Sequence, residues 1–115
     1  MNPTAEPGAI ASPSDLDGYL DEASCDQIVG WAWDKSHPDR FVKIEIFDNG
    51  NPLAYLTADL LREDLRDLGV GTGRYGFIFP VPRSIRDGKP HLISLKIAGT
   101  DFELKTSPQE LVCPP

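Results

Sequence analysis

The alternation of apolar and polar residues predicts a chain built mainly from short β-strands. Across residues 41–48, the apolar residues Val42, Ile44 and Ile46 share one face while Lys43 and Glu45 share the other. This alternation is typical of a strand in an antiparallel sheet with one buried face. Asn49-Gly50 follows directly, and this pair is a strong signal for a two-residue hairpin turn. The sequence therefore predicts a β-hairpin at this point.

The run from Ile28 to Trp33 is apolar on both alternating faces. A strand of this kind is usually central in its sheet and covered on each side. Its odd-numbered face carries large side chains, Val29, Trp31 and Trp33, whereas the even-numbered face is mostly small and includes Gly30. We expect the odd-numbered face to fill the core, which places Trp31 there. Trp33, at the strand end, fits either a core position or an exposed platform.

The rest of the chain adds further strands and one helix. Strands are expected at residues 18–22, 53–57, 77–81, 91–97 and 102–105. Leucines at helical spacing predict a helix over Asp59–Leu68, with Asp59 as the N-cap and Gly69 as the stop, covering one end of the fold. The glycine-rich segment 69–76 is expected to be a flexible connection that needs positive φ. About seven strands and one helix predict a mainly β, Ig-like or fibronectin-like sandwich.

Amino-acid composition adds to the predicted fold mainly at the N-terminus and the C-terminus of the chain. The chain of 115 residues fits one domain. Residues 1–14 are rich in Pro, Ala and Ser and are expected to be a disordered linker, followed by a β-sandwich module at 15–112 and a tail at 113–115. The start lacks the basic and apolar regions of a signal peptide, and no apolar run reaches transmembrane length. The compartment therefore stays open, and membrane insertion is not expected.

Charge and cysteine content narrow the function classes. The net charge of −7, with no basic cluster, argues against nucleic acid and against anionic membrane surfaces as partners. The two cysteines, Cys25 and Cys113, are too few and too far apart for a zinc site. Because no export signal is visible, we expect two unpaired thiols, with a bridge that ties down the tail as the alternative. No cofactor or metal ion is expected.

No group of residues meets the requirements of an active site. His37 lies in a polar turn and His91 begins a strand, and neither belongs to a nucleophile motif. The best binding hypothesis rests on aromatic residues, because sugar rings stack on flat exposed aromatic side chains while polar neighbours bind the hydroxyls. The candidate ligand-binding residues are Trp33, Asp34, Tyr55 and Tyr75. The alternative is that these aromatic residues pack in the core or on its rim.

Several short motifs resemble a bacterial accessory module found beside or inside glycosyltransferases and related polysaccharide-synthesis proteins. The motifs are Gly18-x-Leu20-Asp21, Gly30-Trp31-Ala32-x-Asp34, Ala58-Asp59-x-x-Arg62-x-Asp64-Leu65, Gly76-Phe77 and His91-x-Ile93. The resemblance covers roughly Gly18 to Leu111. It implies a non-catalytic domain, and a cytoplasmic location if the parent is a glycosyltransferase. It further implies structural roles for its shared residues, with Asp59, Arg62 and Asp64 fixing the helix against the sheet.

Three functions are compatible with these observations. The first is a non-catalytic module that binds carbohydrate or a partner glycosyltransferase, which predicts a solvent-facing aromatic platform. The second is a structural spacer or self-association domain, which predicts an exposed sheet edge or apolar patch. The third is a small enzyme, which requires a pocket with converging polar groups. We favour the first two over the third.

Overall fold

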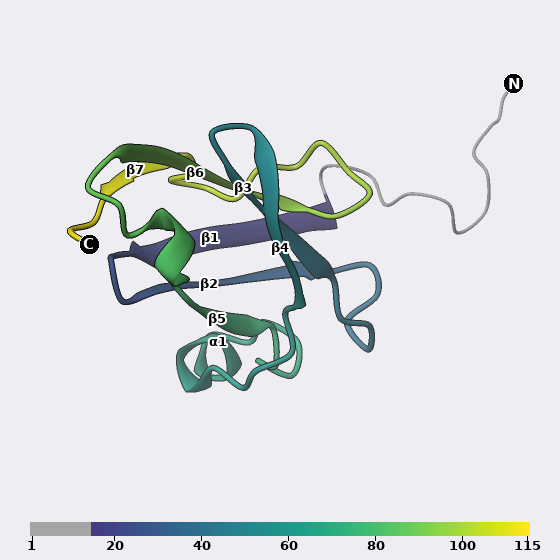
Figure 1. Cartoon of the computed structure of the whole chain (residues 1–115). Coiled ribbons are helices and arrows are strands. Elements are labelled where there is room, and N and C mark those ends of the chain that lie inside the picture. The colour runs from purple at the N-terminus through teal and green to yellow at the C-terminus, as the bar shows by residue number, and fades with distance from the viewer. Residues whose placement is uncertain (1–14) are drawn as a thin grey trace, which may run out of the picture.

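A computed structural model describes residues 15–115 as two antiparallel sheets packed face to face (Figure 1). The expected linker at residues 1–14 lies outside the described residues. One sheet has the order β1-β2-β5, with β1 at Leu16–Ala23, β2 at Gln27–Asp34 and β5 at Gly76–Pro80. The other has the order β4-β3-β6-β7, with bounds Asn51–Thr57, Lys43–Asp48, Pro90–Ile97 and Gln109–Val112. This arrangement confirms the expected β-sandwich.

The hairpin predicted at Asn49-Gly50 joins β3 to β4. Both turn residues have positive φ, 51° for Asn49 and 85° for Gly50, which is the backbone shape that matches the twist of two antiparallel strands. The Asn49 side chain also accepts a hydrogen bond from the Leu92 backbone N–H at 2.8 Å. The turn is therefore fixed both by its own conformation and by its attachment to β6.

The orientation expected for β2 is wrong. Ile28 and Ala32 are fully buried in the core between the sheets, whereas Val29, Trp31 and Trp33 on the opposite face are only half-buried. Gly30 lies on the inner face, where an added Cβ would clash with the Tyr19 carbonyl oxygen and lie 2.7 Å from the Phe77 ring. The small residues face inward because large side chains of neighbouring strands, such as Phe77 of β5, fill the space above them.

Residues 102–105 connect the two sheets on one side of the sandwich. Lys105 pairs in parallel with Tyr19 of β1, and Glu103 forms an antiparallel bridge with Lys96 of β6. Leu104, between these contacts, is buried in the core. The expected last strand is therefore a bridging segment, and the residues that follow it form strand β7. The bridging segment covers the free edge of β1.

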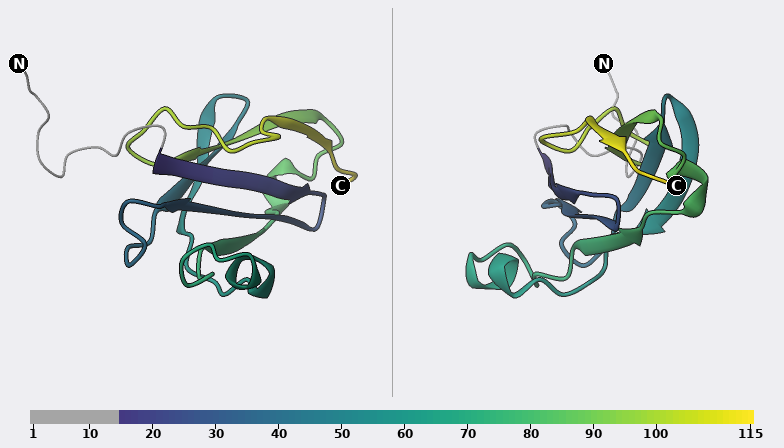
Figure 2. Two further views of the ribbon diagram at one scale, coloured as in Figure 1. Left: turned by 180° about the vertical axis from the view of Figure 1, so that it is seen from behind. Right: turned by 60° about the vertical axis from the view of Figure 1, so that its left-hand side comes forward.

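The helix is shorter than expected, and it does not cover an end of the sandwich. α1 covers Glu63–Asp67, with Arg62 rather than Asp59 at its N-cap position and no side-chain cap. Gly69 ends it with a φ of 81°, as predicted. Leu65 is the buried residue of the helix, while Leu68 is 78% exposed. Figure 2 shows that α1 lies beyond β5, outside the space between the sheets, so it does not cover an end of the sandwich.

The two cysteines form a disulfide, which corrects the expectation of unpaired thiols. Cys25 lies between β1 and β2, and Cys113 follows β7, so the bond ties the three-stranded sheet to the four-stranded sheet. Cys113 is fully buried and belongs to the core cluster. The sandwich therefore extends at least to Cys113, one residue beyond the expected boundary. The spacing of the cysteines could not reveal this pairing because they are 88 residues apart.

His91 is clamped between two carboxylates. Its Nε2 lies 2.8 Å from Asp87 Oδ1 and its Nδ1 lies 2.8 Å from Asp48 Oδ1, and the residue is 8% exposed. Both ring nitrogens can donate only when the imidazole is protonated. The hydrogen bond to Asp87, and then the one to Asp48, raises the pKa of His91 above its ordinary value of 6.5. The clamp therefore favours the charged ring and joins β6 to β3 and to the loop before β6.

This geometry predicts that the protein loses stability as the pH rises. Because the folded pKa of His91 exceeds the unfolded value, its contribution is complete below about pH 6.5 and disappears as the pH passes the folded pKa. Urea unfolding at about pH 6 and about pH 9 measures the difference. We expect His91→Gln to reduce this pH dependence, because the clamp then has no titrating imidazole. A wild-type stability that rises over this range would contradict the clamp.

Candidate functional site

The outward face of the three-stranded sheet carries a group of aromatic side chains, Tyr19, Trp31 and Trp33, which we call the aromatic face. Tyr19 on β1 lies directly opposite Trp31 on β2, and Asp17 lies opposite Trp33. Directly opposed residues in an antiparallel pair place their side chains on the same face, within contact distance. Tyr19 is 40% exposed and both tryptophans are half-buried. Neither tryptophan belongs to the core cluster.

Arg62 forms one border of the aromatic face. Gly76 of β5 lies opposite Trp31, and a Cβ at Gly76 would lie 2.7 Å from Arg62 Cγ. The absent side chain therefore leaves room for the Arg62 methylene groups to cross β5. The Arg62 guanidinium group makes two hydrogen bonds to Asp64, at 2.7 and 3.0 Å, and one to Asp21 at 2.6 Å. The hydrogen bond from Arg62 lowers the pKa of Asp64.

Asp21 reaches Arg62 because β1 contains a bulge. The pairing register between β1 and β2 shifts between Leu20 and Glu22, so Asp21 is an extra, exposed residue in the strand. Arg62 thus ties the segment before α1 to β1 across the sheet. The role that the resemblance implies for Asp59, Arg62 and Asp64, fixing the helix against the sheet, stays a prediction. In the structure, Arg62 contacts Asp64 of α1 and Asp21 of β1.

Lys105 forms the opposite border. Its Nζ lies 2.9 Å from Asp17 Oδ1 and 5.8 Å from the centre of the Tyr19 ring. The hydrogen bond to Asp17 raises the pKa of Lys105 above its ordinary value. A cation near an aromatic ring is weakly attracted to it at an exposed site. The Tyr19 ring therefore has a charged neighbour on the side of residues 102–105.

The ring of Trp33 packs against the buried ring of Tyr75. Their ring centres lie 5.0 Å apart at an angle of 38°. Tyr75 is fully buried, and its hydroxyl donates to the Pro38 carbonyl at 2.9 Å and accepts from the Thr72 N–H at 3.2 Å. An added Cβ at Gly71 would clash with that hydroxyl and lie 2.9 Å from Trp33 Cζ3. The glycine-rich segment is thus packed against Trp33 rather than being a loose connection.

Two of the predicted ligand-binding residues, Tyr75 and Asp34, make contacts that hold the local structure. Tyr75 has no exposed surface, so its ring cannot offer a face to a ligand. Asp34 is held by its own turn, in which Ser36 Oγ donates to Oδ1 at 2.6 Å and His37 Nδ1 lies 3.1 Å from Oδ2. Partial burial opposes ionisation, but these hydrogen bonds lower the pKa of Asp34 overall. Asp34 therefore shapes the turn beside Trp33.

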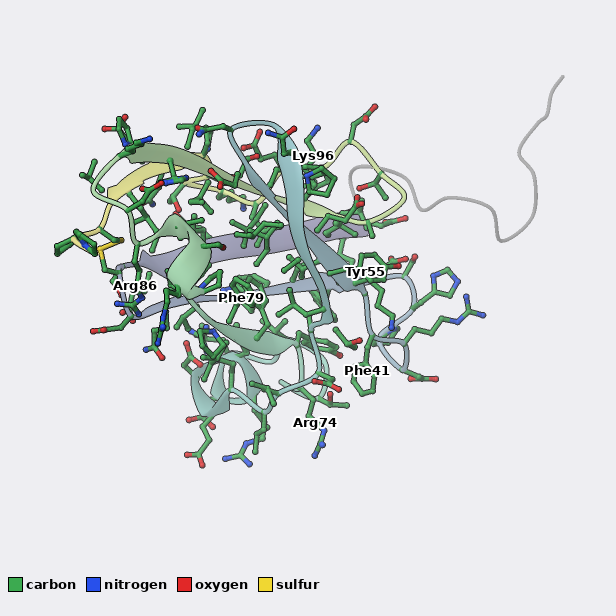
Figure 3. The ribbon with its side chains drawn as sticks, in the orientation of Figure 1. Phe41, Tyr55, Arg74, Phe79, Arg86 and Lys96 are labelled. Carbon is green, nitrogen blue, oxygen red and sulfur yellow. A yellow bond between two sulfur atoms is a disulfide. The ribbon has the colours of Figure 1, made fainter. Side chains whose placement is uncertain are left out.

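Tyr55 lies apart from the other three candidates. It is in β4, and its side chain is 64% exposed on the outer side of the four-stranded sheet (Figure 3). The Lys43 Nζ lies 5.8 Å from the centre of its ring. Among the predicted site residues, Trp33 is therefore the one that contributes to the aromatic face, with Tyr75 and Asp34 packed around it.

Tyr19 and Trp31 are site residues that the sequence pattern did not single out, although a signal exists for Tyr19. In Leu16-Asp17-Gly18-Tyr19-Leu20-Asp21, the tyrosine alternates in step with two aspartates, which marks its face as outward. Trp31 has no such signal, because β2 is apolar on both sides. Only the strand pairing, which sets Tyr19 opposite Trp31, shows which side of β2 faces outward.

Comparison of the chain with protein families, with curated proteins and with solved structures finds no match in any of the three. Within residues 15–115, the structure contains no helix long and apolar enough to cross a bilayer. In the same part of the chain, no three side chains of His, Cys, Asp or Glu gather in a way that could hold a metal ion.

Proposed function

We propose that the protein is a non-catalytic accessory module that binds carbohydrate through the aromatic face. The observation that carries the proposal is the pairing of Tyr19 with Trp31 on the outward side of the three-stranded sheet, with Trp33 two residues further along β2. The resemblance to modules of glycosyltransferases and polysaccharide-synthesis proteins points to the same class of ligand. A partner glycosyltransferase is the other ligand that this resemblance suggests.

The chemistry of the face suits sugar rings. The C–H groups of a pyranose form an apolar surface that packs on an aromatic ring, and burial of apolar area gives about 25 cal/mol per Å². The carboxylates of Asp17 and Asp21 border the rings and can accept hydrogen bonds from sugar hydroxyls. Support from Tyr75 and Arg62 fixes the flanking groups in advance, which lowers the entropy cost of binding.

Substitution of single aromatic residues tests the proposal. We expect Tyr19→Ala to weaken binding to a responsive polysaccharide by on the order of tenfold or more, because an exposed stacking ring is lost. Trp33→Ala should have the same effect. Tyr55→Ala is the matched control, since it removes an exposed tyrosine from the other sheet. A screen over a broad panel of polysaccharides, followed by calorimetry, provides the measurement.

The outcomes separate folding from binding. Tyr19 is more exposed than Trp33, so Tyr19→Ala should keep the wild-type circular dichroism and melting temperature even if Trp33→Ala disturbs the packing around Tyr75. Binding that persists in both variants, or that Tyr55→Ala abolishes, would place the ligand elsewhere. A folded protein that binds no member of the panel would overturn the carbohydrate proposal.

A second candidate, self-association, is favoured by β4, an edge strand that pairs only with β3 among residues 15–115. The Ala58 N–H donates to the Val42 carbonyl at 2.9 Å, and the alternation of an antiparallel ladder then turns the backbone N–H and C=O groups of Tyr55 and Thr57 away from β3. Such an edge can pair with the same edge of a second copy. Absence of glycan binding together with a dimeric molar mass in light scattering would support this alternative.

A further inference from the structure

We infer that the glycan bound on the aromatic face is an uncharged, linear chain and not an acidic polysaccharide, an inference that rests on the proposed function. The first observation is that both cations bordering the face are already held by carboxylates. Lys105 Nζ lies 2.9 Å from Asp17 Oδ1. Arg62 bonds to Asp21 at 2.6 Å and to Asp64 at 2.7 Å. Because a carboxylate already neutralises each cation, an anionic sugar gains less from either one than it would gain from an unpaired cation.

The second observation is the net charge of the face. The ion pairs that border it join Arg62 and Lys105 to Asp17, Asp21 and Asp64, and Glu22 lies opposite Val29 on the same side of the sheet. Two cations against four carboxylates leave two negative charges, and the whole chain has a net charge of −7. The field over the face therefore repels carboxylate, sulfate or phosphate groups on an approaching chain.

The same ion pairs leave the face able to bind hydroxyl groups. A carboxylate oxygen has more than one lone pair, so Asp17 and Asp21 can each hold their cation and still accept a hydrogen bond from a sugar O–H. A hydroxyl donor displaces no ion-pair partner. The polar groups at the border thus discriminate by charge, because they bind neutral hydroxyls without losing an ion pair and disfavour anions.

The arrangement of the rings favours a linear chain. Trp31 and Trp33 are two residues apart on one strand, which separates their Cα atoms by about 6.6 Å along β2. Tyr19 extends the group sideways onto β1. Rings placed along a sheet surface can stack with successive sugars of one extended chain. We therefore expect binding to internal stretches of a polysaccharide, with chain ends unnecessary.

Two matched pairs of polymers test this inference by calorimetry at low salt. Hydroxyethyl cellulose is compared with carboxymethyl cellulose, and dextran with dextran sulfate, so that within each pair the backbone is constant. For a backbone that binds, we expect the uncharged member to bind on the order of tenfold more tightly. The difference should shrink as salt is added, since exposed charges are then screened.

Substitution of one carboxylate gives a sharper comparison. Asp17→Asn removes one negative charge and breaks the ion pair with Lys105. It should therefore raise the affinity for the acidic polymer and narrow the difference in affinity between the two polymers of a pair. Glu110→Gln is the matched control, because it makes the same charge change at an exposed position of β7 on the other sheet. We expect Glu110→Gln to leave the ratio of affinities unchanged.

The result separates the inference from the proposed function. Equal binding of both members, still abolished by Tyr19→Ala, would keep the carbohydrate site and overturn the preference for uncharged chains. Tighter binding of the acidic member would also overturn it. If neither polymer of either pair binds and the broad panel also fails, the proposed function itself is wrong and the inference falls with it.

Discussion

Cys25→Ala is expected to lower the free energy of unfolding by about 4–5 kcal/mol, which is a large share of the total stability of a domain of this size. The disulfide joins residues 88 positions apart, so its loss releases a long loop in the unfolded chain. The folded state loses its covalent tie between the β1–β2 turn and the end of β7. Urea unfolding under oxidising conditions, compared with wild type, measures the change.

Reduction of the wild-type protein provides the control. A thiol reductant should lower wild-type stability by the same amount and leave the stability of Cys25→Ala unchanged, because that variant has no bond to lose. A loss of less than about 1 kcal/mol in both experiments would show that the packing of Cys113 in the core holds β7 without the bond.

The second large effect concerns the two faces of β2. We expect Ile28→Ala to cost about 2–5 kcal/mol, because Ile28 is fully buried between the sheets and its loss leaves a cavity. Val29→Ala, the matched control on the neighbouring residue, should cost about 1 kcal/mol or less, since Val29 is half-buried on the outward face. Both values come from chemical denaturation followed by tryptophan fluorescence.

This comparison decides between the two orientations of the strand. If the odd-numbered face filled the core, as the sequence pattern suggested, Val29→Ala would be the more costly change. Equal costs would mean that the aromatic face is covered as deeply as the core. Only the observed orientation, with Ile28 inside, leaves Trp31 and Trp33 on an outward surface.

The fold class was predictable because most strands carry a strong local signal. Alternation in β3 and β6, and positive φ at Asn49-Gly50, depend on residues close together in the chain. The orientation of β2 was not predictable in this way. A strand that is apolar on both sides gives no periodicity, and the deciding facts are its pairing with Tyr19 and the closeness of Phe77 to Gly30.

The candidate site shows the same limit. Trp33 could be named as a candidate because a tryptophan at a strand end beside a polar turn fits an exposed position, but the burial of Tyr75 depends on its contacts with Pro38 and Thr72. Tyr55 shares its residue type with Tyr75, but the sheet topology places Tyr55 on the four-stranded sheet, away from the other candidates. The disulfide likewise depends on how the last strand returns to the β1–β2 turn. In each case the deciding contact joins residues that are far apart in the sequence.

The most direct test of the account is an NMR titration of the two tryptophan indole N–H signals. The chain contains two tryptophans, so each signal can be assigned with a single Trp33→Phe variant. We predict that an uncharged polysaccharide that binds the protein shifts both indole signals, together with the backbone amides of Tyr19 and Trp31. Binding that shifts amides of β4 and leaves both indole signals unchanged would contradict the aromatic face as the binding site.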